Sequence, residues 1–155
     1  MSNTFTNLIY HIVYSTKYRR TTISAEWQSD LYAYIGGVLL NREGIPLEIG
    51  GTTDHIHILT KLSPKYAIMD VLRDVKADSS KWINERQTSK QRFEWQAGYG
   101  AFSVSSSQVD KVQSYIRNQE EHHRKQSFKE EFLTILRKHQ VEFEIKYVFD
   151  EELIL

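Results

Sequence analysis

Large apolar side chains fill most positions of the stretch from Phe5 to Tyr14. A run of this kind predicts a central β-strand that is covered on both of its faces. Two shorter stretches, 45–49 and 53–59, alternate apolar with polar residues, and two glycines lie in the short connection between them. Alternating segments joined this closely predict an antiparallel β-hairpin.

Apolar residues recur at helical spacing in four other segments. Ser24 and Ser63 are the expected N-caps of the first two, and Pro64 takes the first helical position of the second, where its missing N–H does no harm. The third segment is weakly apolar and rich in charged residues, so we expect it on the surface. The predicted helices span 24–41, 63–84, 108–125 and 128–139.

The remaining residues complete the order of elements. Residues 85–93 are polar and predict a loop, whereas 94–104 predict a strand that bends at its glycines. Residues 141–149 alternate again and predict an extended segment. The order is then strand, helix, strand, strand, helix, strand and helices, a split β-α-β pattern. We therefore expect an α+β fold, ferredoxin-like or RRM-like, with helices on one face of an antiparallel sheet and a C-terminal helix that bears Tyr115.

The composition indicates one globular domain spanning residues 1–155. Hydrophobic residues make up 40% of the chain and charged residues 26%, which is typical of a soluble protein with a single core. Cysteine is absent, which excludes disulfides, thiolate metal sites and a cysteine nucleophile. The N-terminus lacks the features of a signal peptide and no apolar run is long enough to span a bilayer, so we expect a cytoplasmic protein without a membrane partner.

The formal net charge is zero, but the charges are unevenly distributed. An acidic segment, expected to be extended, at about 140–155 holds five acidic residues and one lysine, and the rest of the chain has 19 basic and 15 acidic residues. One basic cluster follows the first strand and contains Lys17, Tyr18, Arg19 and Arg20. Such a cluster can hold phosphates while its ring stacks on a base, and the alternative is a solvated loop.

Two histidines stand out in the strand predicted at 53–59. The alternation of a strand puts His55 and His57 on one face and Ile56 and Ile58 on the other. Two neutral imidazoles side by side are a reasonable half of a divalent-metal site. The alternative is a pair of ordinary surface or half-buried histidines.

Two other polar residues, Asp54 and His11, are not expected to be metal ligands. Asp54 points away from the histidine pair on a regular strand, which favours a role in the turn or behind the metal ligands over direct coordination. His11 lies on the first strand, where we expect a core histidine with a hydrogen-bond partner rather than a ligand.

A second half of the site is sought on the third predicted helix. Gln119 offers one oxygen ligand, and Tyr115 lies one turn before it on the same face. A phenol on a helix that also supplies a ligand can serve as nucleophile toward a metal-polarised phosphate. The alternatives are a packing tyrosine and a solvated glutamine. His122 and His123 are chemically better third ligands, but the spacing from Tyr115 favours Gln119.

These residues resemble a known family. His55-Ile56-His57 is similar to the His-hydrophobic-His motif of the HUH nucleases, and Tyr115-x-x-x-Gln119 matches their single-tyrosine branch, the TnpA-like transposases of small bacterial insertion sequences (the IS200-like superfamily). The first strand with its basic turn, 10–20, and the glycine-rich segment 98–104 are also similar to that family. The resemblance covers nearly the whole chain.

The resemblance implies a metal-dependent transesterase that acts on single-stranded DNA hairpins at the ends of an insertion element. His55, His57 and Gln119 would hold Mg²⁺ or Mn²⁺, and Tyr115 would attack the scissile phosphate. The products would be a 5′-phosphotyrosine and a free 3′-hydroxyl, so that rejoining needs no ATP. The family further implies a homodimer, in which the tyrosine helix serves its own or the partner's histidine pair.

Two other functions are compatible with the same residues. The zero net charge fits a domesticated or non-catalytic module that binds single-stranded nucleic acid by stacking on the sheet. A related HUH nicking enzyme of replication or plasmid transfer is the third possibility, but the chain is short and has no helicase-like region. Sequence alone does not identify the DNA hairpin, the cleavage site or the metal.

Overall fold

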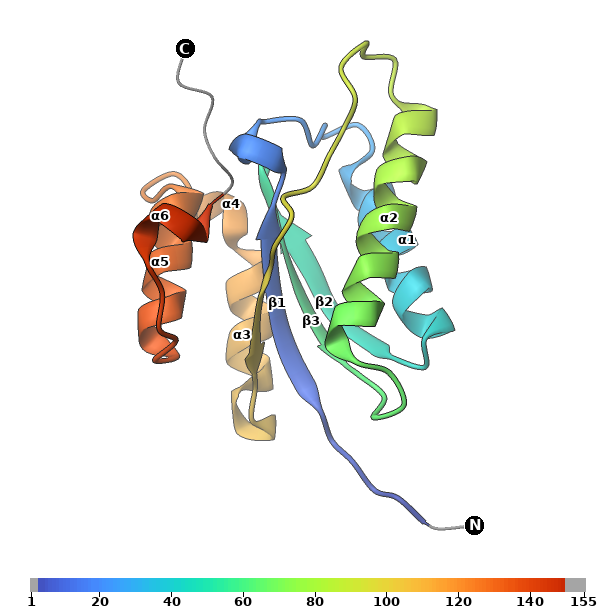
Figure 1. Cartoon of the computed structure of the whole chain (residues 1–155), viewed down its shortest axis with the longest axis vertical. Helices are drawn as coiled ribbons and strands as arrows, with labels where there is room; N and C mark the ends of the chain where they lie inside the picture. Colours follow the sequence, from blue (N-terminus) through green and yellow to red (C-terminus); the bar gives the residue numbers. More distant parts are fainter. Residues whose placement is uncertain (1–2, 150–155) are drawn as a thin grey trace.

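Four strands form one antiparallel sheet in the computed structural model, which describes residues 3–149. The spatial order is β2-β3-β1-β4, with β1 and β3 at the centre (Figure 1). The strands are β1 (Ile9–Ser15), β2 (Ile45–Gly51), β3 (His55–Lys61) and β4 (Gly100–Ser103). This arrangement confirms the predicted α+β, ferredoxin-like fold and the β2-β3 hairpin.

The helices are divided between the two faces of the sheet. Helices α1 and α2 cover one face, and α3 and α5 lie on the other, so the tyrosine-bearing helix is opposite the α1-α2 layer (Figure 1). The helices are α1 (Gln28–Asn41), α2 (Ile68–Arg86), α3 (Val109–Arg117), α4 (Gln119–His122), α5 (Phe128–Lys138) and α6 (Ile145–Val148), with 3₁₀ turns η1 (Lys17–Arg19) and η2 (Ser106–Gln108). No helix within residues 3–149 has both the length and the apolar character needed to cross a bilayer.

Alternation along the central strands decides what each face carries. On β3, Ile56 and Ile58 are fully buried in the core beneath α1 and α2. His55 and His57 therefore point to the opposite face, toward α3, α4 and α5. β1 pairs with β3 in antiparallel register, with Val13 opposite His57. Both central strands are covered on both sides, as the apolar run in β1 predicts.

Two helices begin later than the sequence predicts. The Ser24 hydroxyl accepts a hydrogen bond from the Glu26 N–H, but α1 begins only at Gln28. The Ser63 hydroxyl does the same for the Lys65 N–H, while α2 begins at Ile68. Both serines close local turns instead of capping a helix, because a serine hydroxyl satisfies a turn N–H as readily as a helical one.

Three other expectations need correction. The segment 94–104 forms only the short β4 and one isolated bridge, between Thr16 and Trp95. The helix predicted over 108–125 is interrupted at Asn118, whose φ of −98° and ψ of 23° separate α3 from α4. The segment 141–149 is not fully extended, because 145–148 form the helical turn α6. The acidic residues beyond 149 lie outside the described part of the chain.

Candidate active site

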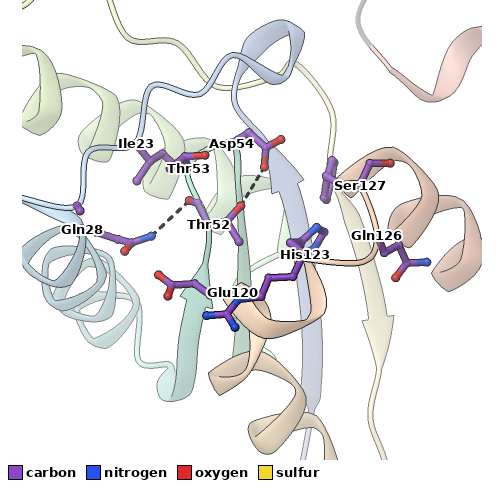
Figure 2. A pocket seen from close by; sticks show the side chains of 12 residues that line it. Ile23, Gln28, Thr52, Thr53, Asp54, Glu120, His123, Gln126 and Ser127 are labelled. Atoms are coloured by element: carbon purple, nitrogen blue, oxygen red, sulfur yellow. Dashed lines mark hydrogen bonds between the residues drawn. The ribbon is translucent and has the colours of Figure 1, made fainter.

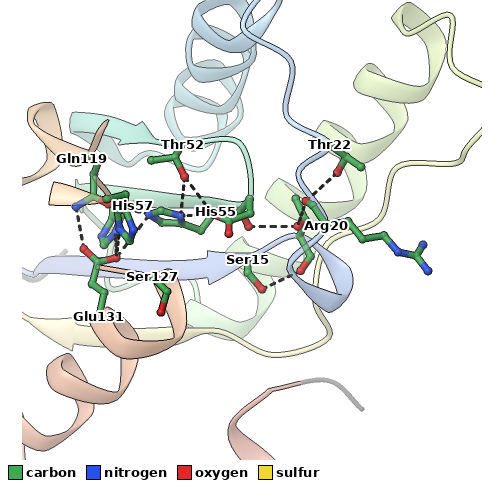
Figure 3. A network of polar contacts seen from close by, with 12 residues as sticks. Ser15, Arg20, Thr22, Thr52, His55, His57, Gln119, Ser127 and Glu131 are labelled. Carbon is green, nitrogen blue, oxygen red and sulfur yellow. Dashed lines mark hydrogen bonds and ion pairs between the residues drawn. The ribbon is translucent and has the colours of Figure 1, made fainter. Parts of the chain in front are cut away.

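The two histidines of β3 lie at the centre of a buried polar cluster. Both side chains are fully buried, and they reach α4 and α5 through Gln119 and Glu131 respectively (Figure 3). The strand alternation predicted their shared face correctly. Burial of two imidazoles requires polar partners, and each ring nitrogen has one.

His55 is held between a carboxylate and an amide. Its Nδ1 lies 2.7 Å from Asp54 Oδ1 and 3.0 Å from Thr52 Oγ1, and its Nε2 lies 2.7 Å from Gln119 Oε1. Burial alone would raise the pKa of the Asp54 carboxyl, but the hydrogen bonds from His55 and Thr52, together with the charge interactions with His55 and His123, lower that pKa below its ordinary value. Asp54 therefore supports His55 from behind, in keeping with the role expected from the sequence.

His57 is joined to a histidine on one side and a carboxylate on the other. Its Nδ1 lies 2.8 Å from His11 Nε2, and its Nε2 lies 3.0 Å from Glu131 Oε1. Burial lowers the pKa of His57 from 6.5 to about 4 and the pKa of His11 to about 3. Both rings are thus neutral at physiological pH, and the neutral form of His57 is the one that binds a metal. His11 is a core residue with a partner, as expected.

Tyr115 and Gln119 lie next to the histidine pair, as the sequence predicts. The Tyr115 ring packs edge-on against His57, with centroids 5.7 Å apart, and its hydroxyl donates a hydrogen bond to Glu131. Burial, followed by the Glu131 carboxylate, raises the pKa of the Tyr115 phenol, which is therefore neutral. Gln119 is buried, and its amide N–H donates to Glu131 Oε2 at 3.0 Å.

Glu131 is the site residue that sequence reasoning missed. Its carboxylate is 1% exposed and lies within 3.0 Å of a His57 nitrogen and a His123 nitrogen. Burial would raise its pKa, but the hydrogen bonds from His123 and His57 hold that pKa well below its usual range. The sequence did contain an indication of this role. Glu131 lies on the apolar stripe of α5 between Phe128 and Phe132, where a charged residue is rarely buried unless it is paired.

His122 and His123, the two alternative ligands, have different surroundings in the structure. His123 belongs to the cluster, with its Nε2 3.0 Å from Glu131 Oε1 and its ring centroid 4.4 Å from that of His55. Burial would lower the pKa of His123, but the Glu131 carboxylate outweighs it and raises that pKa. His122 instead stacks on the Tyr115 ring, with centroids 4.7 Å apart.

The donor set fits a divalent cation. Within residues 3–149, His55, His57 and Glu131 form one group whose ligand atoms all lie within 4.8 Å of one another. When neutral His55 donates its Nδ1 proton to Asp54, its Nε2 lone pair faces the Gln119 oxygen, which is also an acceptor. A cation between these two atoms would satisfy both. Imidazole nitrogens and carboxylate or amide oxygens are common ligands of divalent cations, and the structure adds Glu131 to the predicted ligands.

An open cavity of about 420 Å³ adjoins this cluster, between the start of α1, the β2-β3 turn and the α4-α5 connection (Figure 2). Asp54 and His123 line it, so the cavity reaches the outer side of His55. The Gln28 side-chain amide donates to the Thr52 carbonyl at its other wall. The cavity gives solutes a route to the edge of the buried site.

The basic cluster lies just beyond the end of β1, next to the residue that precedes His55. Lys17, Tyr18 and Arg19 form η1, which directly follows β1, and the preceding Thr16 N–H donates to the Asp54 carbonyl at 2.8 Å. Lys17 and Arg20 both approach the Tyr18 ring, at 5.5 and 5.2 Å from its centroid. The turn is thus ordered around an aromatic ring and tied to the residue before His55.

Comparison with known proteins identifies the family. The model described as "Transposase IS200 like" matches residues 4–119. The chain therefore belongs to the IS200-like transposase family. This match ends at Gln119 and so includes β3, α3 and the first residue of α4, but not α5.

Two relatives agree with this assignment. The chain is 27% identical over 124 residues to the transposase of insertion sequence element IS200 from Salmonella typhimurium, covering 77% of this chain and 81% of the relative. It is 25% identical over 119 residues to the ISDra2 transposase TnpA of Deinococcus radiodurans, covering 72% and 84%.

Two solved structures share the fold. A transposase structure from Deinococcus radiodurans has a TM-score of 0.61 and 22% identity, covering 77% of this chain and 95% of that one. A REP-associated tyrosine transposase bound to a REP hairpin has a TM-score of 0.60 and 14% identity over all of both chains.

Proposed function

We propose that this chain is a metal-dependent transesterase that cuts and rejoins single-stranded DNA at the ends of an insertion element. The observation that carries the proposal is the meeting of a tyrosine hydroxyl with a buried His-His-Glu group. Membership of the IS200-like transposase family supports the same activity. The hairpin bound to the structurally similar REP-associated transposase supports a folded single strand as the ligand.

The proposed roles follow from the contacts. His55, His57, Glu131 and Gln119 would hold Mg²⁺ or Mn²⁺, which when bound would draw negative charge away from the scissile phosphate. The Tyr115 oxygen would form a bond to phosphorus and release its proton to water, while the bond from phosphorus to the 3′-oxygen breaks. The 3′-oxygen would take a proton from water and leave as a hydroxyl. The phosphodiester energy is kept in the 5′-phosphotyrosine, so rejoining needs no ATP.

Two further parts of the chain have proposed roles in binding. The η1 turn, with its two cations packed around the Tyr18 ring, would contact the DNA backbone beside His55. A homodimer would supply two tyrosines for the two strand breaks of excision, because each chain offers one Tyr115 at the site.

The test is covalent trapping. The protein is mixed with Mn²⁺ and end-labelled single-stranded oligonucleotides that tile the DNA flanking its coding region, and adducts are separated under denaturing conditions. The wild type should form an adduct with oligonucleotides that fold into hairpins, and Tyr115→Phe should form none. An adduct of equal yield from Tyr115→Phe would contradict the proposal. Hairpin binding without any adduct, unchanged by Mn²⁺, would instead support a non-catalytic module.

A further inference from the structure

We propose that Glu131 is a positioning residue for the nucleophile: one oxygen of its carboxylate holds the Tyr115 hydroxyl, while the other is fixed by imidazoles of the site. The inference rests on the proposed function, because it takes Tyr115 as the nucleophile. It concerns a helix that lies beyond the 4–119 range matched by the family model.

The two carboxylate oxygens of Glu131 face different groups. Oε1 lies 3.0 Å from His57 Nε2, 3.0 Å from His123 Nε2 and 3.5 Å from His55 Nε2. Oε2 accepts the Tyr115 hydroxyl and, at 3.0 Å, the Gln119 amide N–H. A single planar group therefore sets the spacing between the phenol oxygen and the imidazole nitrogens.

The helix that carries Glu131 is firmly held. The Ser127 hydroxyl caps α5 by accepting the Glu130 N–H at 3.2 Å. Phe128 is buried and stacks on the His55 ring, with centroids 4.6 Å apart and planes 25° from parallel. Phe132 packs with residues of β1 and β4 in the same apolar cluster. Because α5 is fixed to the sheet at these points, the carboxylate is a rigid reference for the phenol.

Without the hydrogen bond to Glu131, the Tyr115 hydroxyl would no longer be held in one orientation. The Tyr115 hydroxyl donates a hydrogen bond to Glu131, whereas the Tyr115 ring is held by packing against His57 and His122. Packing of this kind fixes the plane of the ring more tightly than the direction of the O–H bond. Misplacement of a reacting group by about 1 Å costs on the order of 100-fold in rate.

The experiment compares three full-length variants with the wild type. Glu131→Leu removes the acceptor, Glu131→Gln keeps a neutral one, and Glu130→Gln is the matched control, since Glu130 is the exposed neighbour on the same helix. The single-turnover rate of adduct formation is measured with saturating DNA and saturating Mn²⁺, so that a weaker metal site does not limit it. We expect a loss of about 100-fold for Glu131→Leu, a smaller loss for Glu131→Gln and none for Glu130→Gln.

A second readout needs neither DNA nor metal. Tyrosines are labelled with ¹³C at Cζ, and the Tyr115 resonance is assigned by its absence in Tyr115→Phe. The resonance should move in Glu131→Leu and stay in place in Glu130→Gln, because the chemical shift of Cζ responds to the hydrogen bond of the hydroxyl. If Glu131→Leu does not fold, Glu131→Gln carries the same comparison, with a smaller displacement expected.

The outcomes separate this inference from the proposed function. A displaced resonance together with the rate loss supports the positioning role. An unmoved resonance overturns it, as does a wild-type rate in Glu131→Leu. An adduct formed by Tyr115→Phe would contradict the proposed function instead, whatever the Glu131 variants do.

Discussion

At the scale of single residues, His11 and His57 share one hydrogen bond whose direction depends on what His57 binds. For His57 to offer its Nε2 lone pair to a cation, its proton must lie on Nδ1, and His11 Nε2, 2.8 Å away, must then accept that proton's hydrogen bond. A neutral imidazole can act as donor or acceptor by changing tautomer. His11 can therefore support the tautomer of His57 that offers Nε2 to a metal, by accepting a hydrogen bond from Nδ1.

Replacing His11 should weaken the metal site. We expect His11→Phe to lower the Mn²⁺ affinity by about 10-fold, which is the scale measured when a partner behind a metal ligand is removed. Isothermal calorimetry of the protein without DNA measures this affinity. Tyr10→Phe is the control, because Tyr10 is adjacent on β1 and packs on the other face of the sheet. Equal affinities for the two variants would exclude the role of His11.

The same residue should govern part of the acid sensitivity. The pKa of His11 is about 3 in the folded protein, below its ordinary 6.5, so the unfolded chain binds the extra proton as pH falls through 6.5. Stability from the neutral ring is therefore present above pH 6.5 and is lost progressively below it. Between pH 7 and 5 the wild type should lose about 2 kcal/mol more unfolding free energy than His11→Phe. Urea denaturation at both pH values measures the difference, and equal losses would contradict it.

At the scale of elements, the position of α3 depends on one glycine of β2. A Cβ on Gly50 would lie 2.7 Å from the carbonyl oxygen of Ile116, so the helix and the strand meet backbone to backbone. Two polar contacts hold the same pair of elements: Gln113 Nε2 donates to the Leu47 carbonyl at 3.3 Å, and Arg117 pairs with Glu48 at 2.8 Å. Gly50 thus sets the distance between the tyrosine-bearing helix α3 and the sheet.

A methyl group at this position should raise α3 and carry Tyr115 away from His57. We expect Gly50→Ala to slow adduct formation by about 10-fold or more, because a displaced nucleophile loses its alignment. Gly37→Ala is the matched control: its Cβ would meet no atom within 4 Å, and alanine in a helix interior should be neutral or slightly stabilising. Equal rates for the two alanine variants would mean that Gly50 does not set the position of Tyr115.

The helices and strands also show which parts of the candidate site the sequence could predict. Period-two alternation correctly placed His55 and His57 on one face. Tyr115 and Gln119 also meet at this site, although they lie on α3 and α4 and not on the single helix that the one-turn spacing assumed. The break at Asn118 had no comparable signal in the sequence. Glu131 was missed because its partners lie on β3, α3, α4 and the α4-α5 connection, which only the folded chain brings together.

At the scale of the whole molecule, every member of the cluster comes from one chain. β3 supplies the histidines, α4 the glutamine and α5 the carboxylate, which lie together in Figure 3. α3 adds the tyrosine, whose hydroxyl contacts Glu131. The sequence could not decide whether Tyr115 serves its own chain or a partner's. Within one chain, Tyr115 reaches its own His57 and Glu131.

A complementation experiment tests this arrangement. Tyr115→Phe and His57→Ala each destroy a different half of the site, and we expect a mixture of the two proteins to form no adduct, because neither chain then has a complete site. Thermal melting of His57→Ala checks that it remains folded. Recovery of a substantial part of the wild-type yield in the mixture would show that Tyr115 crosses between chains.

The depth of the site has a consequence for the fate of the covalent intermediate. His55, His57, Gln119 and Glu131 are each at most 1% exposed. In the proposed reaction, a DNA strand would reach the imidazoles only when α4 moves away from His55, because Phe128 and Phe132 hold α5 on the sheet. The frequency of that opening would then set an upper limit on cleavage. With α4 back in place beside a DNA-bound Tyr115, bulk water would be kept from the phosphorus, and this enclosure would favour transfer to a 3′-hydroxyl over loss by hydrolysis.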